Sequence, residues 1–120
     1  MPLDITNWPS STTETDEATA LLIRARALVA RGWCRGAAAR NRFGFRVCPL
    51  SSGAVAWCAS GALEAAALVV SDLDRRHAWV RLRSAIGGAS IHAFNDTQET
   101  VEPILAAFDR AIAASRGSAP

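Results

Sequence analysis

The stretch AVAWCASGALEAAALVV, residues 54–70, is the most apolar part of the 120-residue chain. Ser60 and Glu64 are its only polar side chains. A helix that is apolar almost all round is normally buried, and small alanine and glycine side chains let neighbouring backbones come close. The pattern therefore predicts a central, buried helix over 54–70, with Ser51 or Ser52 as its N-cap.

The segment before this stretch predicts a second helix. Apolar residues over 18–29 recur at the i, i+3, i+4, i+7 spacing of one helical face. Thr13 is a suitable N-cap, with Asp16 three positions later as an acidic capping partner. Gly32 marks a stop. We therefore expect a helix over 14–31.

A third helix is expected after the apolar stretch. It covers residues 73–86, with Ser71 or Asp72 as N-cap and the glycine pair at 87–88 as stop. Residues 90–94 then alternate weakly between polar and apolar side chains. This alternation is typical of an extended linker or a short strand.

The last helical segment has two candidate starts. Its apolar stripe runs over residues 101–112. Residues 96–99 have the form of a capping box if Asp96 is the N-cap. Pro103 would then lie inside the helix and kink it, or else it marks the true start. The sequence leaves this boundary open.

These elements predict a mainly α protein. Half of the residues are hydrophobic but only 7% are aromatic, which favours close-packed helices over a sheet. We expect a small four-helix domain, orthogonal or bundle-like, with one long irregular loop over 32–53. The sequence also allows a minor two-stranded element that joins residues near 45 to those near 92. The predicted organisation is a flexible polar segment at 1–13, a single helical domain at 14–114 and a frayed tail at 115–120.

Composition restricts the environment of the protein. No apolar run reaches the ~18–20 residues that a membrane-spanning helix needs, so we expect no membrane partner. The three cysteines allow at most one disulfide, which excludes a disulfide scaffold. The first seventeen residues contain no Arg or Lys, unlike a secretory or transit signal. We therefore expect a cytoplasmic protein with reduced thiols.

The charges are segregated along the chain. All thirteen basic residues are Arg, and residues 18–63 contain seven of them without a single Asp or Glu. The net charge is only +2. Such arginines form one of two surfaces. The first is a patch that binds phosphate or the acidic surface of another protein, and the second is a solvated helix face that Asp and Glu side chains from elsewhere in the chain neutralise. The residues best suited to contact a partner are Arg35, Arg40, Arg42, Arg46, Phe43 and Phe45.

Cysteine and histidine allow two kinds of site. A zinc site would combine the three cysteines with a histidine, namely Cys34, Cys48 and Cys58 with His92 or His77. Structural zinc sites usually contain a C-x₂₋₄-C knuckle, which this chain lacks, so we expect no metal and no cofactor. A thiol hydrolase would use Cys58 as nucleophile, His92 as base and Asn95 as orienter. Burial in an apolar helix would leave Cys58 unreactive, as a small hydrophobic residue.

Four motifs together resemble an uncharacterised family of small bacterial and phage proteins. They are RGWCRGAAAR at 31–40, AVAWCASGAL at 54–63, FND at 94–96 and FDRAI at 108–112. The family pattern has Trp before the Asn-Asp pair, where this chain has Phe94. The resemblance covers about residues 21–112 and implies a compact, mostly helical fold of phage or mobile-element ancestry, without an assigned activity. The matching residues are Trp33, Gly36, Ala37, Arg40, Trp57, Cys58, Gly61, Asn95 and Asp96.

Most of these matching residues are expected to serve packing or capping. Asn95 and Asp96 would form the turn and cap of the last helix. Asp96 would alternatively fix the long loop through a buried ion pair with Arg35 or Arg40.

The functional hypothesis is a non-enzymatic binding protein. It would contact a macromolecular partner, either a protein or a nucleic acid, through the Arg-rich segment. The alternatives are a thiol hydrolase that uses Cys58 and His92, and an Arg-driven nucleic-acid binder.

Overall fold

The computed structural model describes residues 16–68 and 70–117. These residues contain five helices and one two-stranded sheet. In chain order the elements are α2 (Glu17–Arg31), β1 (Ala39–Asn41), β2 (Ala54–Trp57), α3 (Ala59–Ala66), α4 (Asp72–Ala85), α5 (Ile91–Thr97) and α6 (Glu102–Gly117). The mainly α fold is confirmed, with five helices rather than four.

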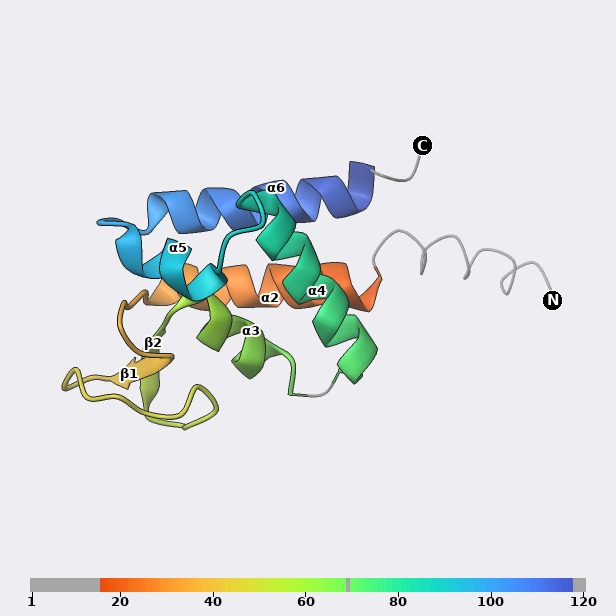
Figure 1. The fold of residues 1–120 in the computed structure, drawn as a ribbon. Helices are drawn as coiled ribbons and strands as arrows, with labels where there is room; N and C mark the ends of the chain where they lie inside the picture. Colours follow the sequence, from red (N-terminus) through yellow and green to blue (C-terminus); the bar gives the residue numbers. More distant parts are fainter. Residues whose placement is uncertain (1–15, 69, 118–120) are drawn as a thin grey trace, which may run out of the picture.

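The helices surround one apolar core. Helices α2 and α6 lie side by side in opposite directions, α4 crosses both of them, and α3 packs against α2 (Figure 1). The largest fully buried side chains come from all four of these helices, namely Leu21, Leu22, Leu63, Leu82, Ile104 and Phe108. Burial of each such side chain contributes about 1.5–3 kcal/mol to the stability of the fold. No helix in the described residues has the length and apolar character needed to cross a bilayer.

Residues 32–58, here called the lobe, project from one end of this helical body (Figure 1). Strand β1 pairs antiparallel with β2, with Ala39 opposite Trp57. Trp33 pairs with the other edge of β2 in a parallel bridge to Trp57. Arg40 and Arg46 form a further antiparallel bridge. The segment predicted as an irregular loop over 32–53 is therefore partly regular. Helix α2 begins and α6 ends at the end of the helical body opposite the lobe (Figure 1).

The prediction of one helix over 54–70 is wrong in its first part. Residues 54–57 form β2, because their backbone finds partners in the preceding segment. The Trp57 N–H donates to the Gly32 carbonyl over 2.9 Å, across the edge opposite β1. Alanine-rich sequence favours a helix only weakly, and tertiary backbone pairing overrides this preference.

Helix α3 begins after a cap that the sequence did not predict. The N-cap is Cys58 rather than Ser51 or Ser52, and its Sγ accepts from the Gly61 N–H over 3.3 Å. The Cys58 N–H itself donates to the Ala38 carbonyl over 3.1 Å. Cys58 therefore ends the strand pairing and starts the helix.

The prediction of a linker or strand at 90–94 is also wrong. Residues Ile91–Thr97 form α5, and the Ser90 hydroxyl caps this helix by accepting from the Ala93 N–H. Only Ile91 and Asn95 are buried in α5. Two buried positions in so short a helix are too few to produce a recognisable helical period in the sequence.

Helix α6 begins at Glu102, so Pro103 marks the true start of the last helix. In the first turn of a helix the missing N–H of proline costs nothing, because that donor has no partner within the helix. Asp96 is not the cap of α6, since it belongs to α5. The predicted strand pair between residues near 45 and 92 is wrong as well: the sheet joins β1 to β2.

The predictions for α2 and α4 are confirmed closely at three of their four ends. Helix α2 ends at Arg31 with Gly32 as C-cap, and α4 has Ser71 as N-cap. Gly87 and Gly88 follow α4 with φ angles of 81° and 83°, which glycine adopts at little cost. At the start of α2 the N-cap is Asp16 itself. Thr13 and the predicted polar segment at 1–13 lie outside the described residues.

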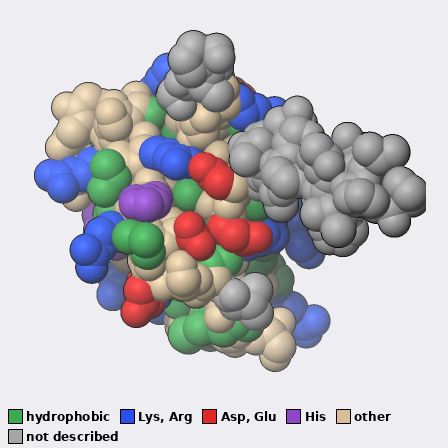
Figure 2. Space-filling model, turned by 90° about the vertical axis from the view of Figure 1, so that its right-hand side faces the viewer, with side chains coloured by type: hydrophobic (Ala, Val, Ile, Leu, Met, Phe, Trp, Pro, Cys, Tyr) green, Lys and Arg blue, Asp and Glu red, His purple; other side chains and the backbone are tan. Residues whose placement is uncertain are grey.

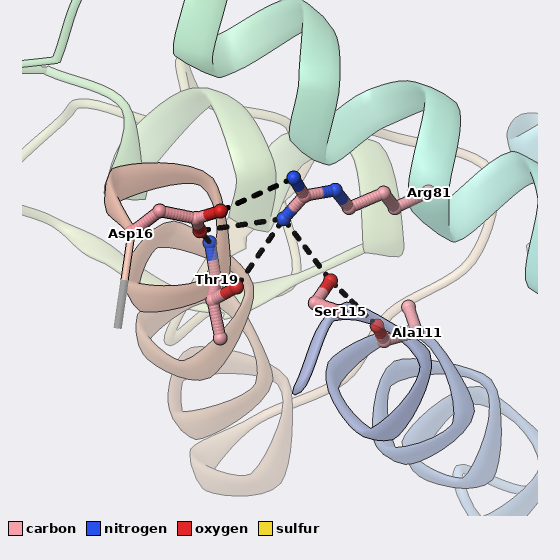
Figure 3. A network of polar contacts seen from close by, with 5 residues as sticks. All are labelled: Asp16, Thr19, Arg81, Ala111 and Ser115. Carbon is pink, nitrogen blue, oxygen red and sulfur yellow. Dashed lines mark hydrogen bonds and ion pairs between the residues drawn. The ribbon is translucent and has the colours of Figure 1, made fainter. Parts of the chain in front are cut away.

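The Arg81 guanidinium on α4 connects the ends of α2 and α6 (Figure 3). It donates to the Asp16 carboxylate over 3.2 and 3.3 Å and to the Thr19 hydroxyl over 3.2 Å. It also donates over 3.1 Å to the Ser115 hydroxyl, which donates in turn to the Ala111 carbonyl. Burial alone would raise the pKa of Asp16, but the hydrogen bonds from Arg81 and Thr19 outweigh it and lower the pKa to about 2.

This network predicts a stability that depends on pH in acid. The pKa of Asp16 is about 2 in the fold, below its ordinary value of 3.8, so ionised Asp16 stabilises the fold above about pH 4. The contribution is lost as the pH falls toward 2. Because the carboxylate is half exposed, we expect only about 0.5–1 kcal/mol.

Asp16→Asn is the matched variant, because asparagine keeps the capping oxygen but cannot ionise. Urea midpoints of the wild type and the variant should differ near neutral pH and converge toward pH 2. A difference that stays constant over this range would contradict the role of the charge.

Candidate functional site

Four large apolar side chains lie exposed on the lobe. Phe43 and Phe45 are each 68% exposed, and Leu50 and Val55 are about half exposed. The two phenylalanines belong to the turn of residues 41–46, which we call the tip. The Asn41 side-chain oxygen accepts from the N–H groups of Phe43 and Phe45 over 2.9 and 3.0 Å. These bonds fix the backbone that carries both rings.

The guanidinium groups of two arginines of the tip have no hydrogen-bond or ion-pair acceptor among the described residues, and we call these groups uncommitted. The Arg42 guanidinium lies over the Phe43 ring, 4.8 Å from its centroid. Within the described residues neither Arg42 nor Arg46 donates a side-chain hydrogen bond or forms an ion pair with a carboxylate. Both side chains are exposed. Their N–H donors are therefore available to solvent or to a bound anion.

Arg35 and Arg40 are instead bound to the backbone of the protein. Arg40 donates to the Gly44 carbonyl over 2.9 Å and to the Arg35 carbonyl over 3.0 Å. Arg35 donates to the Gln98 carbonyl over 2.6 Å and lies over the Trp33 ring. Of the six predicted contact residues, the tip thus brings together Arg42, Arg46, Phe43 and Phe45. Arg40 holds the tip in shape, and Arg35 fastens the lobe to the segment after α5.

The lobe concentrates the positive charge of the protein. It contains four arginines and no carboxylate, a formal charge of +4, whereas the other described residues contain nine arginines and nine carboxylates. Of the seven arginines in the acid-free stretch, only Arg26 forms an ion pair with a described carboxylate, that of Asp109. At the end of the body opposite the lobe, acidic and basic side chains lie side by side (Figure 2).

Asn95 is the buried polar centre that joins the lobe to the helices. Its side chain is fully buried, and its oxygen accepts from the Trp33 indole N–H over 2.9 Å and from the Ala59 N–H over 3.0 Å. Its amide nitrogen donates to the Cys34 carbonyl and to the Asp96 carboxylate, each over 3.1 Å. Every hydrogen-bonding position of the side chain is thus filled. Asn95 therefore links the lobe to the helices and does not form the predicted turn before the last helix, because it lies inside α5.

Asp96 holds the start of the lobe through the backbone. Its carboxylate accepts from the Gly36 N–H over 3.1 Å, and this hydrogen bond lowers the pKa of Asp96 below its ordinary value. Asp96 is exposed, and among the described residues it forms no ion pair. The predicted buried ion pair with Arg35 or Arg40 is therefore wrong. A backbone amide provides the contact instead, because the chain turns at Gly36 with a φ of 77°.

No hydrogen bond joins Cys58 to His92 in the described part of the chain. The Cys58 Sγ lies 3.2 Å from the Ser60 Oγ, and the Ser60 Oγ lies 3.2 Å from the His92 Nδ1. The imidazole thus reaches the serine rather than the thiol. Cys58 is 3% exposed, in agreement with the expectation that it is buried, and the Asn95 side chain is occupied elsewhere. Within residues 16–68 and 70–117 no three His, Cys, Asp or Glu side chains are placed to hold a metal ion.

The three thiols are predicted to differ sharply in reactivity. Cys48 is exposed, whereas Cys34 and Cys58 are buried, and burial raises the pKa of the Cys34 thiol to about 11. Ellman's reagent should therefore modify one thiol rapidly in the folded protein and all three after denaturation. Cys48→Ser should remove the rapid phase. Rapid modification of Cys58 in that variant would contradict its buried capping role and favour the thiol-hydrolase hypothesis.

Sequence reasoning missed two contributors to this surface, Leu50 and Val55. The apolar pattern over 54–70 predicts Val55 inside a buried helix, and Leu50 follows a proline in a segment without periodicity. Nothing in the local sequence shows that either is exposed, because exposure depends on which face of the lobe the helices cover.

Three of the four motif segments named above meet at Asn95: residues 31–40, 54–63 and 94–96. A family model described as a family of unknown function, DUF6197, matches residues 13–114. No curated protein and no solved structure matches the chain. The family match covers most of the 120 residues and agrees with the expectation of an uncharacterised family. The chain therefore belongs to DUF6197, a family of unknown function.

Proposed function

We propose that the protein is a non-enzymatic binding protein whose lobe contacts an anionic macromolecule. The main support for this proposal is the formal charge of +4 on the lobe, because arginines and carboxylates are equal in number in the other described residues. The tip adds two exposed phenylalanine rings beside the uncommitted guanidinium groups of Arg42 and Arg46. Arginine and aromatic side chains are enriched in macromolecular interfaces, where they supply much of the binding free energy.

The same proposal places the protein in the cytoplasm. All three cysteines are unpaired, which is typical of a reducing compartment.

A charge-reversal pair tests the lobe. In Arg42→Glu/Arg46→Glu the tip changes sign, and capture of the partner on immobilised protein should fall at least about tenfold, because an attractive contact becomes repulsive. The matched control is Arg76→Glu/Arg116→Glu. Both of these arginines are exposed, have no acceptor among the described residues, and lie on α4 and α6 outside the lobe. The control has the same net charge as the tip variant. Equal loss of capture in both would show that net charge, and not the lobe, governs binding.

A further inference from the structure

We infer that the macromolecule bound by the lobe is a single-stranded nucleic acid. This inference rests on the proposed function and adds the chemical class of the partner. The tip offers two kinds of contact at once, namely guanidinium groups for phosphates and flat rings for bases.

The phosphate contacts come from arginines that have no hydrogen-bond or ion-pair acceptor among the described residues. Arg42 and Arg46 are exposed, and no carboxylate or carbonyl of the described residues accepts from their side chains. A guanidinium group can bind a phosphate through two parallel hydrogen bonds. Arg35 adds a third positive charge at the base of the lobe, although one of its nitrogens is bound to Gln98.

The base contacts come from Phe43 and Phe45. Each ring is 68% exposed, and the Asn41 oxygen fixes the backbone beneath both. Bases of a single strand stack on exposed aromatic rings, while a basic surface follows the backbone. The Arg42 guanidinium lies over one face of the Phe43 ring, so on that face a base would stack on the planar guanidinium group, as bases also do on arginine.

A single strand fits the tip better than a duplex or an acidic protein. Paired bases are already stacked on one another, and reading the major groove of a duplex requires a helix or a two-stranded ribbon that enters it. The tip is the turn of a short antiparallel pair that has a single bridge, Arg40 with Arg46, and this pair is much shorter than a ribbon that fills a groove. Acidic side chains of a protein pair with the guanidinium groups alone, whereas each nucleotide supplies both a phosphate for a guanidinium group and a flat base for a ring.

The experiment measures the fluorescence anisotropy of a labelled oligothymidylate of about 20 nucleotides, longer than the ~4–16 nucleotides that one small binding domain covers. The full chain is titrated at several salt concentrations. With three arginines near phosphates, log K against log salt should have a slope of about −2. A duplex of the same length and poly-L-glutamate serve as competitors.

Two double variants separate the two kinds of contact. Phe43→Leu/Phe45→Leu keeps the charge and the apolar character but removes the rings, and should weaken binding at least about tenfold with an unchanged salt slope. Arg42→Gln/Arg46→Gln should reduce the steepness of the slope by about 1.4. Arg76→Gln/Arg116→Gln is the matched control and should bind like the wild type.

Three results would overturn the inference. One is the absence of oligothymidylate binding. The second is equal binding by the wild type and the Phe43→Leu/Phe45→Leu variant. The third is stronger competition by poly-L-glutamate or duplex than by unlabelled oligothymidylate. If poly-L-glutamate binds and the Arg42→Gln/Arg46→Gln variant loses it, the partner class is wrong while the proposed binding function stands. If no polyanion binds through the tip, the inference and the proposed function both fail.

Discussion

Asn95→Leu is expected to remove about 3–5 kcal/mol of stability, a large part of the ~5–15 kcal/mol typical of a small domain. Leucine has the same number and branching of side-chain heavy atoms as asparagine but makes no hydrogen bonds. The substitution leaves the Trp33 indole N–H, the Ala59 N–H and the Cys34 carbonyl without their partner. Because Asn95 is fully buried, water does not replace it without opening the junction between lobe and helices. Urea unfolding followed by circular dichroism measures the loss.

Asp96→Asn is the matched control for this prediction. It makes a similarly small change at the next position, but there the side chain is exposed and the new amide keeps an oxygen for the Gly36 N–H. We expect a cost below about 1 kcal/mol. If both variants lose the same stability, Asn95 is not the link between lobe and helices.

Gly61→Ala is expected to destabilise the fold by about 3–4 kcal/mol, the upper range for overpacking a core. A Cβ at this position would lie 2.0 Å from the Ala38 carbonyl oxygen and 2.8 Å from its carbon. Both atoms belong to the backbone, and the oxygen accepts from the Cys58 N–H, so it cannot move without breaking that bond. In an isolated helix the same change would stabilise by about 1 kcal/mol. Thermal unfolding should therefore show a lower midpoint temperature for Gly61→Ala than for the wild type, whereas helix propensity alone predicts a higher one.

Gly53→Ala is the control for the glycine effect. Its Cβ would meet only the Ser51 hydroxyl, at the ordinary contact distance of 3.6 Å, and Gly53 does not adopt a positive φ. We expect a change within about 0.5 kcal/mol, or a slight stabilisation through the unfolded chain. A large loss of stability in Gly53→Ala would mean that replacing a glycine by alanine is harmful in general. The close approach of Gly61 to Ala38 would then not explain the destabilisation of Gly61→Ala.

The stability variants and the binding variants affect different parts of the molecule. Asn95 and Gly61 are buried where the lobe joins the helices, whereas Phe43, Phe45 and Arg46 are exposed at the tip. Tip variants should therefore unfold like the wild type. Any loss of binding in them can then be assigned to the tip surface itself.

The amino-acid sequence by itself determined the mainly α fold, the C-terminal end of α2 and both ends of α4. These features depend on signals within a few residues of each other: an apolar stripe, Ser71 as a cap, and glycines at 32, 87 and 88. The sequence also predicted that Cys58 is buried and that arginines and phenylalanines occur together after α2. Local composition was sufficient for these conclusions, because helix ends and apolar periodicity are local properties.

Tertiary structure decided the strand at 54–57, helix α5 and the position of Asn95 at the centre of the junction. Three of the four partners of Asn95 are 36 to 62 residues away in the chain, and the strand forms because a distant backbone supplies its hydrogen bonds. Contacts between such separated residues leave no period or cap in the local sequence. They exist only once the helices have packed and brought the three segments to one place.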